Sequence, residues 1–367
     1  MPLHEPEHTD MQLTRPPIVL TLLGVALSSG VVGAQRTDSV TSHPSVLMKE
    51  FIADQPPTPS AHASTIVEVP GGLVAAWFGG TREGAPDVEI WLARSTAGRW
   101  SPPVVVGTGV QADGTRFPCY NPVLFYSADG VLHLFYKVGP RPSKWWGMHR
   151  ASRDDGRTWS DAVRLPEGIL GPVKNKPLVL PNGTIIAGSS TESTDSVSIW
   201  RVHFEISRDN ARTWRLVMPS SPTTDTELNA IQPSILVHRD GRLQAVGRTR
   251  SARIFETWST DSGATWGPLT LTALPNPNAG TDALTLRDGR QLIVYNNTPR
   301  GRTPLNVAVS PDGKTWNSVL VLEDAPGEYS YPAVIQTRDG LVHITYTWQR
   351  QRVRHVVLDP ARLGDAH

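Results

Sequence analysis

The chain has 367 residues, of which 39% are hydrophobic and 19% are charged, and its formal net charge is +1. This length suits two ordinary domains or one large repeat domain. The near-neutral charge, with no basic block, gives no support for nucleic acid as a partner. The 31 glycines and 32 prolines are scattered at turns, which is typical of a chain of many short strands.

An apolar stretch near the start differs from the rest of the chain. It reads IVLTLLGVALSSGVVG at 18–33, follows Arg15 and ends in small residues. At about 16 residues it is short for a membrane span, so residues 1–34 are predicted to be a signal peptide and leader, with a retained anchor helix as the alternative. The acidic stretch before Met11 is unusual for a signal peptide, so translation starting at Met11 is a second reading. We expect a secreted or periplasmic protein with no membrane attachment after the leader is removed.

Six two-residue turn signals recur with a period of about 50 residues. Each is a Gly-Gly, Asn-Gly or Asp-Gly pair followed by an apolar or alternating strand. Such pairs favour tight hairpins, because both turn positions need positive φ. The second residues of the pairs are Gly72, Gly130, Gly183, Gly241, Gly289 and Gly340.

A second repeated signal falls between the hairpins. SRDDGRTW at 152–159 returns as SRDNARTW at 207–214 and STDSGATW at 259–266, with a shortened copy at 310–316 and a divergent one at 94–100. The Asp and Ser or Thr side chains of such a turn can bond its backbone, and the Trp can pack between sheets. We therefore expect these turns to be structural and assign none of their residues to catalysis.

The two periods together predict an all-β fold, a six-bladed β-propeller with four strands per blade over residues 46–360. The segment VLMKEFI at 46–52 is predicted to supply the outer strand that the last unit lacks. Residues 35–45 then form a linker and residues 361–367 a C-terminal tail. The alternative, two stacked β-sandwich domains, does not explain a single period that runs from His62 to His355.

In a propeller, the starts of the innermost strands converge on the central channel. The predicted starts are polar in all six units: His62, Asn121, Lys176, Gln232, Asp282 and Tyr331. A ring of polar groups at one mouth is costly without a ligand or water. We expect the ring to bind a ligand, and a water-filled channel is the alternative.

The repeated turns, with the pattern Ser-x-Asp-x-Gly-x-Thr-Trp, resemble the Asp-boxes, or BNR repeats, of the sialidase (neuraminidase) superfamily, and residues 46–360 look like its six-bladed fold. The resemblance implies a retaining glycosidase with a Tyr nucleophile, because a neutral phenol avoids repulsion from the carboxylate of the sugar. It also implies a Glu that activates the Tyr, an Asp that acts as acid and base, and three Arg that bind the substrate carboxylate.

Three of these positions have counterparts in recognisable segments. EYSYPAVI at 328–335 resembles the Tyr-Ser segment of the family and places the nucleophile at Tyr329. RGRTPLNVAVSPDGKTW and GRLQAVGRTR resemble the segments that carry two of the arginines, and these place the carboxylate ligands at Arg302 and Arg248.

The remaining positions match less closely. GGTREGAPDVEIWLAR at 79–94 lies where the family has its acid/base loop, with Asp87 as the preferred acid and Glu83 as the alternative. The first Arg of the family aligns with His62, and the Glu that activates the Tyr aligns with Gln232. The resemblance therefore implies a site that diverges from the family, with less carboxylate binding and no Glu to accept the Tyr proton.

Other side chains extend the predicted site. Lys137, Lys174 and Lys176 add cations that can face an anionic sugar. Trp145 and Trp146 are adjacent on a predicted strand, so they point to opposite faces, and one of them can form a stacking platform for a sugar ring.

We expect an exported sialidase-like exo-glycosidase that hydrolyses a terminal acidic sugar from a glycan, with His62 as a base or carboxylate ligand. One alternative is a lyase of uronic-acid polysaccharide, in which His62 acts with Tyr329 or Tyr331. The other is a carbohydrate-binding propeller without catalysis. The expected partner is an acidic glycan and the expected state a monomer. There is no cofactor motif, and His203 and Glu205 share a strand face without a third metal ligand.

Overall fold

The computed structural model describes residues 43–194, 198–221 and 228–364. The predicted signal peptide and leader lie outside the described residues, as does most of the predicted linker. In the described part of the chain, no helix is long and apolar enough to cross a membrane.

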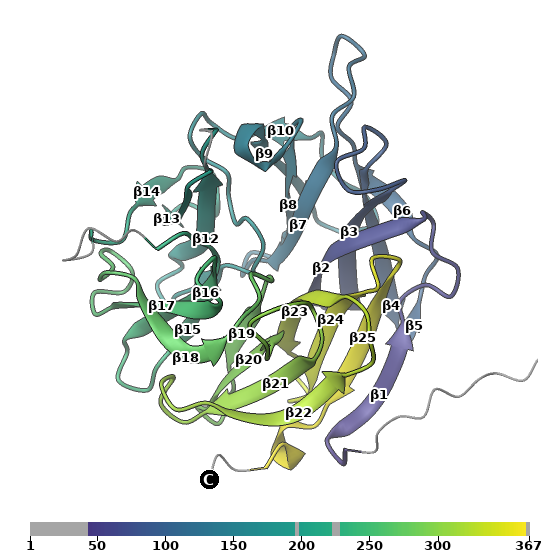
Figure 1. The fold of residues 1–367 in the computed structure, drawn as a ribbon. Helices are drawn as coiled ribbons and strands as arrows, with labels where there is room; N and C mark the ends of the chain where they lie inside the picture. The colour runs from purple at the N-terminus through teal and green to yellow at the C-terminus, as the bar shows by residue number, and fades with distance from the viewer. Residues whose placement is uncertain (1–42, 195–197, 222–227, 365–367) are drawn as a thin grey trace, which may run out of the picture. The chain divides into compact units, whose positions relative to one another are not determined.

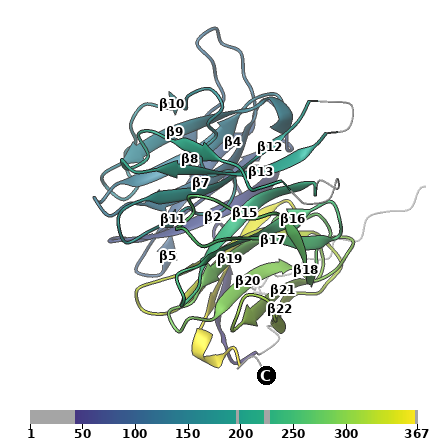
Figure 2. The same cartoon turned by 90° about the vertical axis from the view of Figure 1, so that its left-hand side faces the viewer.

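The described residues form six antiparallel sheets arranged around a common centre (Figure 1). Two short 3-10 helices, η1 (Pro142–Lys144) and η2 (Pro360–Arg362), accompany the strands. The perpendicular view separates the sheet of β7–β10 from the sheet of β15–β18 (Figure 2). The predicted six-bladed β-propeller is confirmed, and the two-sandwich alternative is excluded.

Each blade is built outwards from the centre. The first, innermost strands are β2 (Ser60–Val69), β7 (Cys119–Tyr126), β11 (Leu178–Val179), β15 (Ala230–Val237), β19 (Asp282–Thr285) and β23 (Tyr329–Gln336). The second strands are β3 (Gly72–Gly80), β8 (Leu132–Val138), β12 (Ile185–Glu192), β16 (Leu243–Thr249), β20 (Gln291–Asn296) and β24 (Val342–Trp348).

The outer half of each blade follows the same order. The third strands are β4 (Glu89–Thr96), β9 (Trp146–Ser152), β13 (Trp200–Ser207), β17 (Arg253–Ser259), β21 (Leu305–Ser310) and β25 (Arg352–Leu358). The outer strands are β5 (Arg99–Trp100) and β6 (Val104–Gly107), which both pair with β4, then β10 (Val163–Arg164), β14 (Arg215–Val217), β18 (Thr270–Pro275), β22 (Asn317–Glu323) and β1 (Val46–Phe51).

The last blade is closed by the start of the described chain. Strand β1 pairs antiparallel with β25, and Lys49 lies opposite Val356. The prediction that residues 46–52 supply the missing outer strand is therefore confirmed.

Apolar packing between neighbouring blades holds the ring together. Because each blade packs on both faces, its middle strands are nearly continuous apolar runs, and all residues of β8 are buried. Between the first two blades, Val74 and Leu92 pack with Leu124 and Leu134 in one cluster.

The repeated polar turns lie between the third and fourth strands, where the sequence placed them. In the turn at 259–266, the Ser259 hydroxyl donates to Asp261 Oδ1 (2.8 Å), and the Gly263 N–H donates to Ser259 Oγ (2.9 Å). The Thr265 N–H donates to the same Asp261 oxygen (2.9 Å). The same three bonds recur in the turns at 152–159, 207–214 and 310–316.

The antiparallel order of strands gives each blade two different ends. The turns between first and second strands and between third and fourth strands meet at one end, which we call the turn end. There, Asn210 in one polar turn donates to Asp129 in the hairpin of the preceding blade (3.2 Å). The starts of the first strands and the connections between second and third strands meet at the other end, which we call the strand-start end.

Candidate active site

Backbone bulges mark the strand-start end of four inner strands. Ala63, Asn121, Gln232 and Tyr331 have φ between 39° and 60°, and the register to the second strand shifts at each of them. Positive φ is uncommon for residues other than glycine and often accompanies function. In the first blade the bulge residue is Ala63, which is equivalent to Asn121, Gln232 and Tyr331. The predicted ring used His62 for this blade, which is one residue too early.

Tyr331 lies among cations contributed by three other blades. The charged groups of Arg248, Arg302 and Lys174 lie 5.2, 5.6 and 5.7 Å from the centre of its ring. The ring of His62 lies 4.2 Å from the same point. We call these five residues the Tyr331 cluster. Only 8% of the Tyr331 surface is exposed, so these charges act over short distances with little solvent between them.

A further arginine joins the cluster through shared carboxylates. Arg302 Nη1 and Arg350 Nε both donate to Glu328 Oε1, at 2.8 and 2.7 Å. Arg350 also forms an ion pair with Glu83. Sequence reasoning missed Arg350, because the turn between β24 and β25 carries no motif. Its position between a second and a third strand, which brings it to the strand-start end, is the signal that could have found it.

Arg248 is nearly buried and incompletely bonded. Its Nη1 donates to the carbonyl oxygen of Asn278 (3.2 Å), and its guanidinium lies 5.0 Å from the ring centre of Trp200. Its Nε has no hydrogen-bond partner in the described part of the chain. A buried donor without a partner is costly, which makes Arg248 a strong candidate to receive an anionic ligand.

His62 is neutral at ordinary pH. Burial lowers its pKa well below the usual range, and the charges of Arg350, Arg302 and Arg248 lower the pKa further. Its Nδ1 shares a hydrogen bond with the Thr347 hydroxyl (2.9 Å). The neutral imidazole beside Tyr331 offers a lone pair to a proton, although the lowered pKa makes it a weak base.

Tyr329, the predicted nucleophile, is placed elsewhere. It is 2% exposed and packs in the apolar core of the last two blades, with its ring centre 6.4 Å from that of Trp348. Its hydroxyl accepts a hydrogen bond from Gln349 Nε2 (3.3 Å). The structure brings Tyr331, and not Tyr329, together with the predicted arginines.

Of the two acids in the predicted acid/base loop, Glu83 contacts an arginine of the site, whereas Asp87 contacts its own loop. Asp87 is exposed and accepts hydrogen bonds from the backbone and hydroxyl of Thr81, and the hydroxyl bond is the main cause of its lowered pKa. This arrangement fits a loop-stabilising role. Glu83, in the same loop, pairs with Arg350.

Lys176 and Asp282, both predicted to bind substrate, bind each other. Lys176 Nζ lies 3.0 Å from both carboxylate oxygens of Asp282. Asp282 also accepts from the Ser234 hydroxyl (2.8 Å) and the Val334 N–H (2.8 Å). This one carboxylate therefore joins four blades, which supports a structural role.

Lys174, by contrast, lies beside Tyr331, with its Nζ 5.7 Å from the centre of the tyrosine ring. Its Nζ donates to the carbonyl oxygens of Thr281 (2.9 Å) and Pro332 (2.7 Å) and to the Asn175 side chain (2.7 Å). Burial lowers its pKa to about 7. Lys174 is thus fixed in the cluster.

The other predicted residues occupy varied places. Asn121 and Gln232 are buried at their bulges, and Gln232 Oε1 has no partner among the described residues. Lys137 is buried and donates to the Pro172 carbonyl (2.8 Å). His203 Nε2 lies 3.0 Å from Glu205 Oε1, and the described residues contain no group of three metal-ligating side chains.

Comparisons with known proteins agree with this architecture. The fold places the protein in the class of six-bladed propellers. The chain belongs to the sialidase superfamily, since the family described as "BNR repeat-like domain" matches residues 71–344. A sialidase of Bacteroides fragilis (strain YCH46) is 22% identical over 255 residues, which are 60% of this chain and 44% of that protein. The chain thus spans less than half the length of this relative.

Solved structures show the same fold. A protein of unknown function from Dyadobacter fermentans has a TM-score of 0.70 at 18% identity and covers 85% of this chain and 98% of its own. The Hadza microbial sialidase Hz136 has a TM-score of 0.68 at 17% identity, covering 84% and 68%. The NanB sialidase of Streptococcus pneumoniae has a TM-score of 0.66 at 13% identity, covering 87% and 71%.

Proposed function

We propose that the protein is an exo-glycosidase that removes a terminal acidic sugar from a glycan. The observation that carries the proposal is the Tyr331 cluster, in which a tyrosine lies among two arginines, a lysine and a neutral histidine. Such a site suits a substrate with a carboxylate next to the reacting carbon, because the phenol is neutral and the cations bind the anion.

Arg248, Arg302 and Arg350 are assigned to the substrate carboxylate. Arg248 has a free buried donor, and Arg350 is held by Glu83 and Glu328. A substrate carboxylate would compete with Glu83 for Arg350. Binding would therefore release the Glu83 carboxylate from Arg350, and Glu83 then takes up a proton from solvent, which it gives to the leaving group in the chemical step.

The chemical step is assigned to three side chains. The Tyr331 oxygen attacks the anomeric carbon while the bond to the leaving oxygen breaks. His62 accepts the phenolic proton in place of the Glu that Gln232 replaces, and Glu83 gives a proton to the leaving oxygen. Water then cleaves the sugar–tyrosine bond, giving one proton to Glu83 while His62 returns its proton to Tyr331. Asp87 and Tyr329, chosen from the sequence, are replaced in these roles by Glu83 and Tyr331.

Substitution of the two tyrosines tests this proposal. Wild type, Tyr331→Phe and Tyr329→Phe would be assayed on methyl glycosides of sialic acid, of related 3-deoxy-ulosonic acids and of uronic acids. We expect Tyr331→Phe to lower turnover by at least about 1,000-fold, and Tyr329→Phe to retain most of it. A larger loss in Tyr329→Phe, with folding unchanged, would restore Tyr329 as the nucleophile. Glu83→Gln should lose more activity than Asp87→Asn.

The contact between His62 and Tyr331 also favours a second candidate, a lyase of uronic-acid polysaccharide. In that reaction His62 would remove the proton next to the carboxylate, and Tyr331 would protonate the leaving oxygen. An unsaturated uronate absorbs in the ultraviolet, whereas hydrolysis gives no such product. Absorbance during turnover therefore separates the two reactions.

We also propose that the protein acts outside the cytoplasm. The apolar stretch at 18–33 supports this proposal. N-terminal sequencing of protein recovered from cell fractions tests it, since cleavage near Ala34 is expected and an intact leader on cytoplasmic protein would contradict it.

A further inference from the structure

A pocket of about 250 Å³ lies between the last blade and the first, and we call it the turn-end pocket. It is bordered by the turns between first and second strands of both blades and by the turn after β4. The Tyr331 cluster lies at the opposite, strand-start end, so the reaction proposed there gives this pocket no role. Its lining includes three carboxylates and two imidazoles: Glu50, Glu68, Asp339, His343 and His355.

Three of these side chains form a hydrogen-bonded chain. His343 Nδ1 lies 3.0 Å from His355 Nε2, and His355 Nδ1 lies 3.0 Å from Glu50 Oε1. Trp100 Nε1 also donates to Glu50 Oε1 (2.9 Å). Burial raises the pKa of Glu50, but the contacts with His355 and Trp100 outweigh burial and lower the pKa overall. Glu50 is therefore an ionised carboxylate, which only accepts hydrogen bonds.

The carboxylate fixes the direction of this chain. When both imidazoles are neutral, His355 donates from Nδ1 to Glu50 and therefore accepts at Nε2. His343 then donates from Nδ1 to His355, which leaves a lone pair on its own Nε2. Burial lowers the pKa of His343 to about 4, so this ring is neutral at ordinary pH. The chain thus ends in a hydrogen-bond acceptor.

The second blade has an equivalent pair of histidines that is closed at this end. His133 Nδ1 lies 2.9 Å from His149 Nε2, as His343 Nδ1 lies beside His355 in the last blade. The other nitrogen of His133, Nε2, is bonded to the hydroxyl of Ser127, six residues before it (3.2 Å). Both ring nitrogens of His133 therefore have partners within the blade.

The last blade leaves the corresponding nitrogen open. Thr337 stands six residues before His343, but its hydroxyl donates to Asp339 and to the Leu341 carbonyl oxygen instead. Among the described residues, His343 Nε2 has no hydrogen-bond partner, although His343 is only 8% exposed and lines the pocket. A buried acceptor without a partner is costly, so we expect the pocket to hold a group that donates to it.

Ser95 faces the same pocket from the first blade. It lies opposite Trp100 on the neighbouring strand β5, so the two side chains share one face of the sheet. The Trp100 side chain on that face reaches Glu50 of the last blade, so Ser95 also points into the space between the two blades. Ser95 is 7% exposed, and its hydroxyl oxygen has no partner in the described part of the chain. The pocket therefore holds a second polar atom that is open to a ligand.

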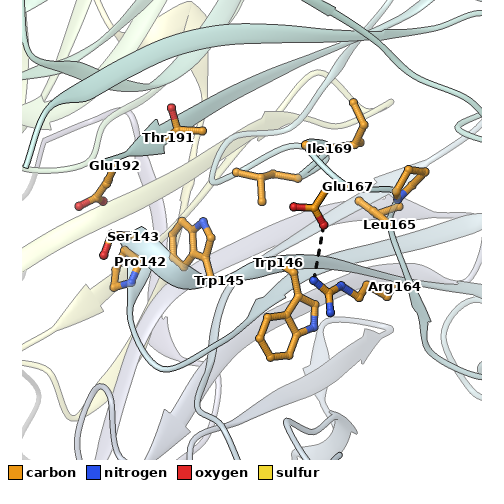
Figure 3. Close-up of a pocket in the computed structure, with 13 residues that line it drawn as sticks. Pro142, Ser143, Trp145, Trp146, Arg164, Leu165, Glu167, Ile169, Thr191 and Glu192 are labelled. Atoms are coloured by element: carbon orange, nitrogen blue, oxygen red, sulfur yellow. Dashed lines mark ion pairs between the residues drawn. The ribbon is translucent and has the colours of Figure 1, made fainter. Parts of the chain in front are cut away.

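The charges of the turn-end pocket differ from those of the pocket between the second and third blades. In that other pocket, the Arg164 guanidinium covers Trp146 at 4.7 Å and lies 3.9 Å from Glu167 (Figure 3). The described residues that line the turn-end pocket include no lysine or arginine, and Arg338, outside the lining, pairs with Glu68 (3.5 Å). The excess of carboxylates favours a cation. Because the described residues contain no group of three metal-ligating side chains, an organic cation fits this pocket better than a metal ion.

We propose that the turn-end pocket binds a small aliphatic amine in its ammonium form. The ammonium group donates hydrogen bonds to His343 Nε2 and Ser95 Oγ and is attracted by the Asp339 carboxylate. The alkyl chain packs on Met48 and Leu73, which also line the pocket. The volume is below the roughly 300–1,000 Å³ of pockets for drug-sized ligands, so the ligand is small.

A series of ligands tests this proposal on the full chain without use of turnover. Affinities for n-butylamine, butyltrimethylammonium and 1-butanol would be measured by ligand-observed NMR at pH 8, above the ordinary histidine pKa of about 6.5. Butyltrimethylammonium keeps the charge without N–H donors, and butanol keeps a donor without the charge. We expect butylamine to bind at least about tenfold more tightly than either, a difference of about 1.4 kcal/mol. Failure of butylamine to bind, or equal affinity for butyltrimethylammonium, would overturn the proposal.

Variants of the chain locate the binding site. His343→Gln should lower the affinity for butylamine about tenfold, because it removes the imidazole acceptor. His133→Gln, at the equivalent position of the second blade, is the matched control and should leave the affinity unchanged. Ser95→Ala removes a single oxygen and should lower the affinity about threefold. It decides the matter if His343→Gln does not fold. Unchanged affinity in folded His343→Gln, or in Ser95→Ala when that variant decides alone, would overturn the assignment.

Two further ligands distinguish other occupants of the pocket. Zinc chloride supplies a metal ion, and Nα-acetyl-lysine methylamide carries the same ammonium group on a peptide backbone. We expect both to bind more weakly than butylamine. Tighter binding of zinc that is lost in His343→Gln would replace the amine with a metal ion. Tighter binding of the lysine derivative would replace the free amine with a lysine side chain of another protein.

Discussion

The two ends of the propeller are built from the same strands and differ in one respect: the turn end repeats and the strand-start end does not. At the turn end, the same serine, aspartate and threonine bonds recur in four blades. At the strand-start end, five of the six blades contribute different side chains, and four of these side chains lie around the ring of the fifth, Tyr331. Residues that repeat from blade to blade therefore stabilise the fold. Residues that differ between blades are expected where the blades contact different parts of one ligand.

The largest effect is expected where the strand-start end is structural. Asp282→Asn removes the charge that balances Lys176 and leaves the N–H of Val334 and the hydroxyl of Ser234 facing an amide. We expect a loss of about 3 kcal/mol in the free energy of unfolding, measured with urea. Asp240→Asn, in an exposed pair with Arg242 at the turn end, is the control and should change stability by less than about 0.5 kcal/mol. Equal losses in both variants would mean that Asp282 does not join the blades.

The next effect is on activity alone. Arg350→Gln removes the guanidinium that bonds Glu328 and Glu83, and we expect kcat/KM to fall about 100-fold with a nearly unchanged melting temperature. Arg338→Gln serves as control, because Arg338 lies in the hairpin of the same blade and pairs with Glu68 at the turn end. Full activity in Arg350→Gln would remove this arginine from the site.

A smaller effect is expected on the stability of the protein at acidic pH. His133, His149 and His343 have pKa values lowered to about 4 by burial. These histidines are neutral in the folded protein, while the unfolded chain binds protons below about pH 6.5. The contribution of these three histidines to the free energy of unfolding is therefore fully present above pH 6.5 and is lost as the pH falls from 6.5 towards 4. We expect the melting temperature to fall by several degrees between pH 7 and pH 5.

The fourth blade shows that glutamine can take the place of these histidines. Gln244 is bonded to His238, six residues before it, just as His133 in the second blade is bonded to Ser127, six residues before it. A variant with His133→Gln and His343→Gln should lose part of the pH dependence between 7 and 5. An identical pH dependence in wild type and variant would show that other groups cause it.

The smallest effect is expected at a single repeated turn. Asp261→Ala removes the bonds to Ser259 and Thr265 from an exposed loop, so we expect the melting temperature to fall by only a few degrees. Activity measured well below that temperature should equal that of wild type. A loss of activity without a loss of stability would contradict the division between the two ends.

The fold could be predicted because its signals are local. A Gly at a tight turn and an Asp that bonds its own loop are visible in a few adjacent residues, and their period gave six blades and the closing strand. The site was harder, because its members meet only after six blades assemble. Tyr331 was predicted from its place at a strand start, and Arg248 and Arg302 from segments that resemble the family, but their partner Arg350 stands in a turn with no pattern of its own.

The choice between Tyr329 and Tyr331 shows a second limit. In a regular strand, residues two apart point to the same face, so neither tyrosine is favoured. The bulge at Tyr331, with φ of 52°, breaks this alternation and leaves Tyr329 in the core. Three of the four bulge residues precede a proline, as in Asn121-Pro122, Gln232-Pro233 and Tyr331-Pro332, and this pattern is a usable signal.

The closure of the last blade has a consequence for how the chain folds. Glu50 of β1 and His355 of β25, which share a hydrogen bond, are 305 positions apart in the sequence. The entropy of closing so long a loop opposes this pairing until the intervening blades have shortened the distance between the two strands. The β1–β25 pair is thus expected to form late in folding, and until then β25 is an uncovered sheet edge that can pair with another chain.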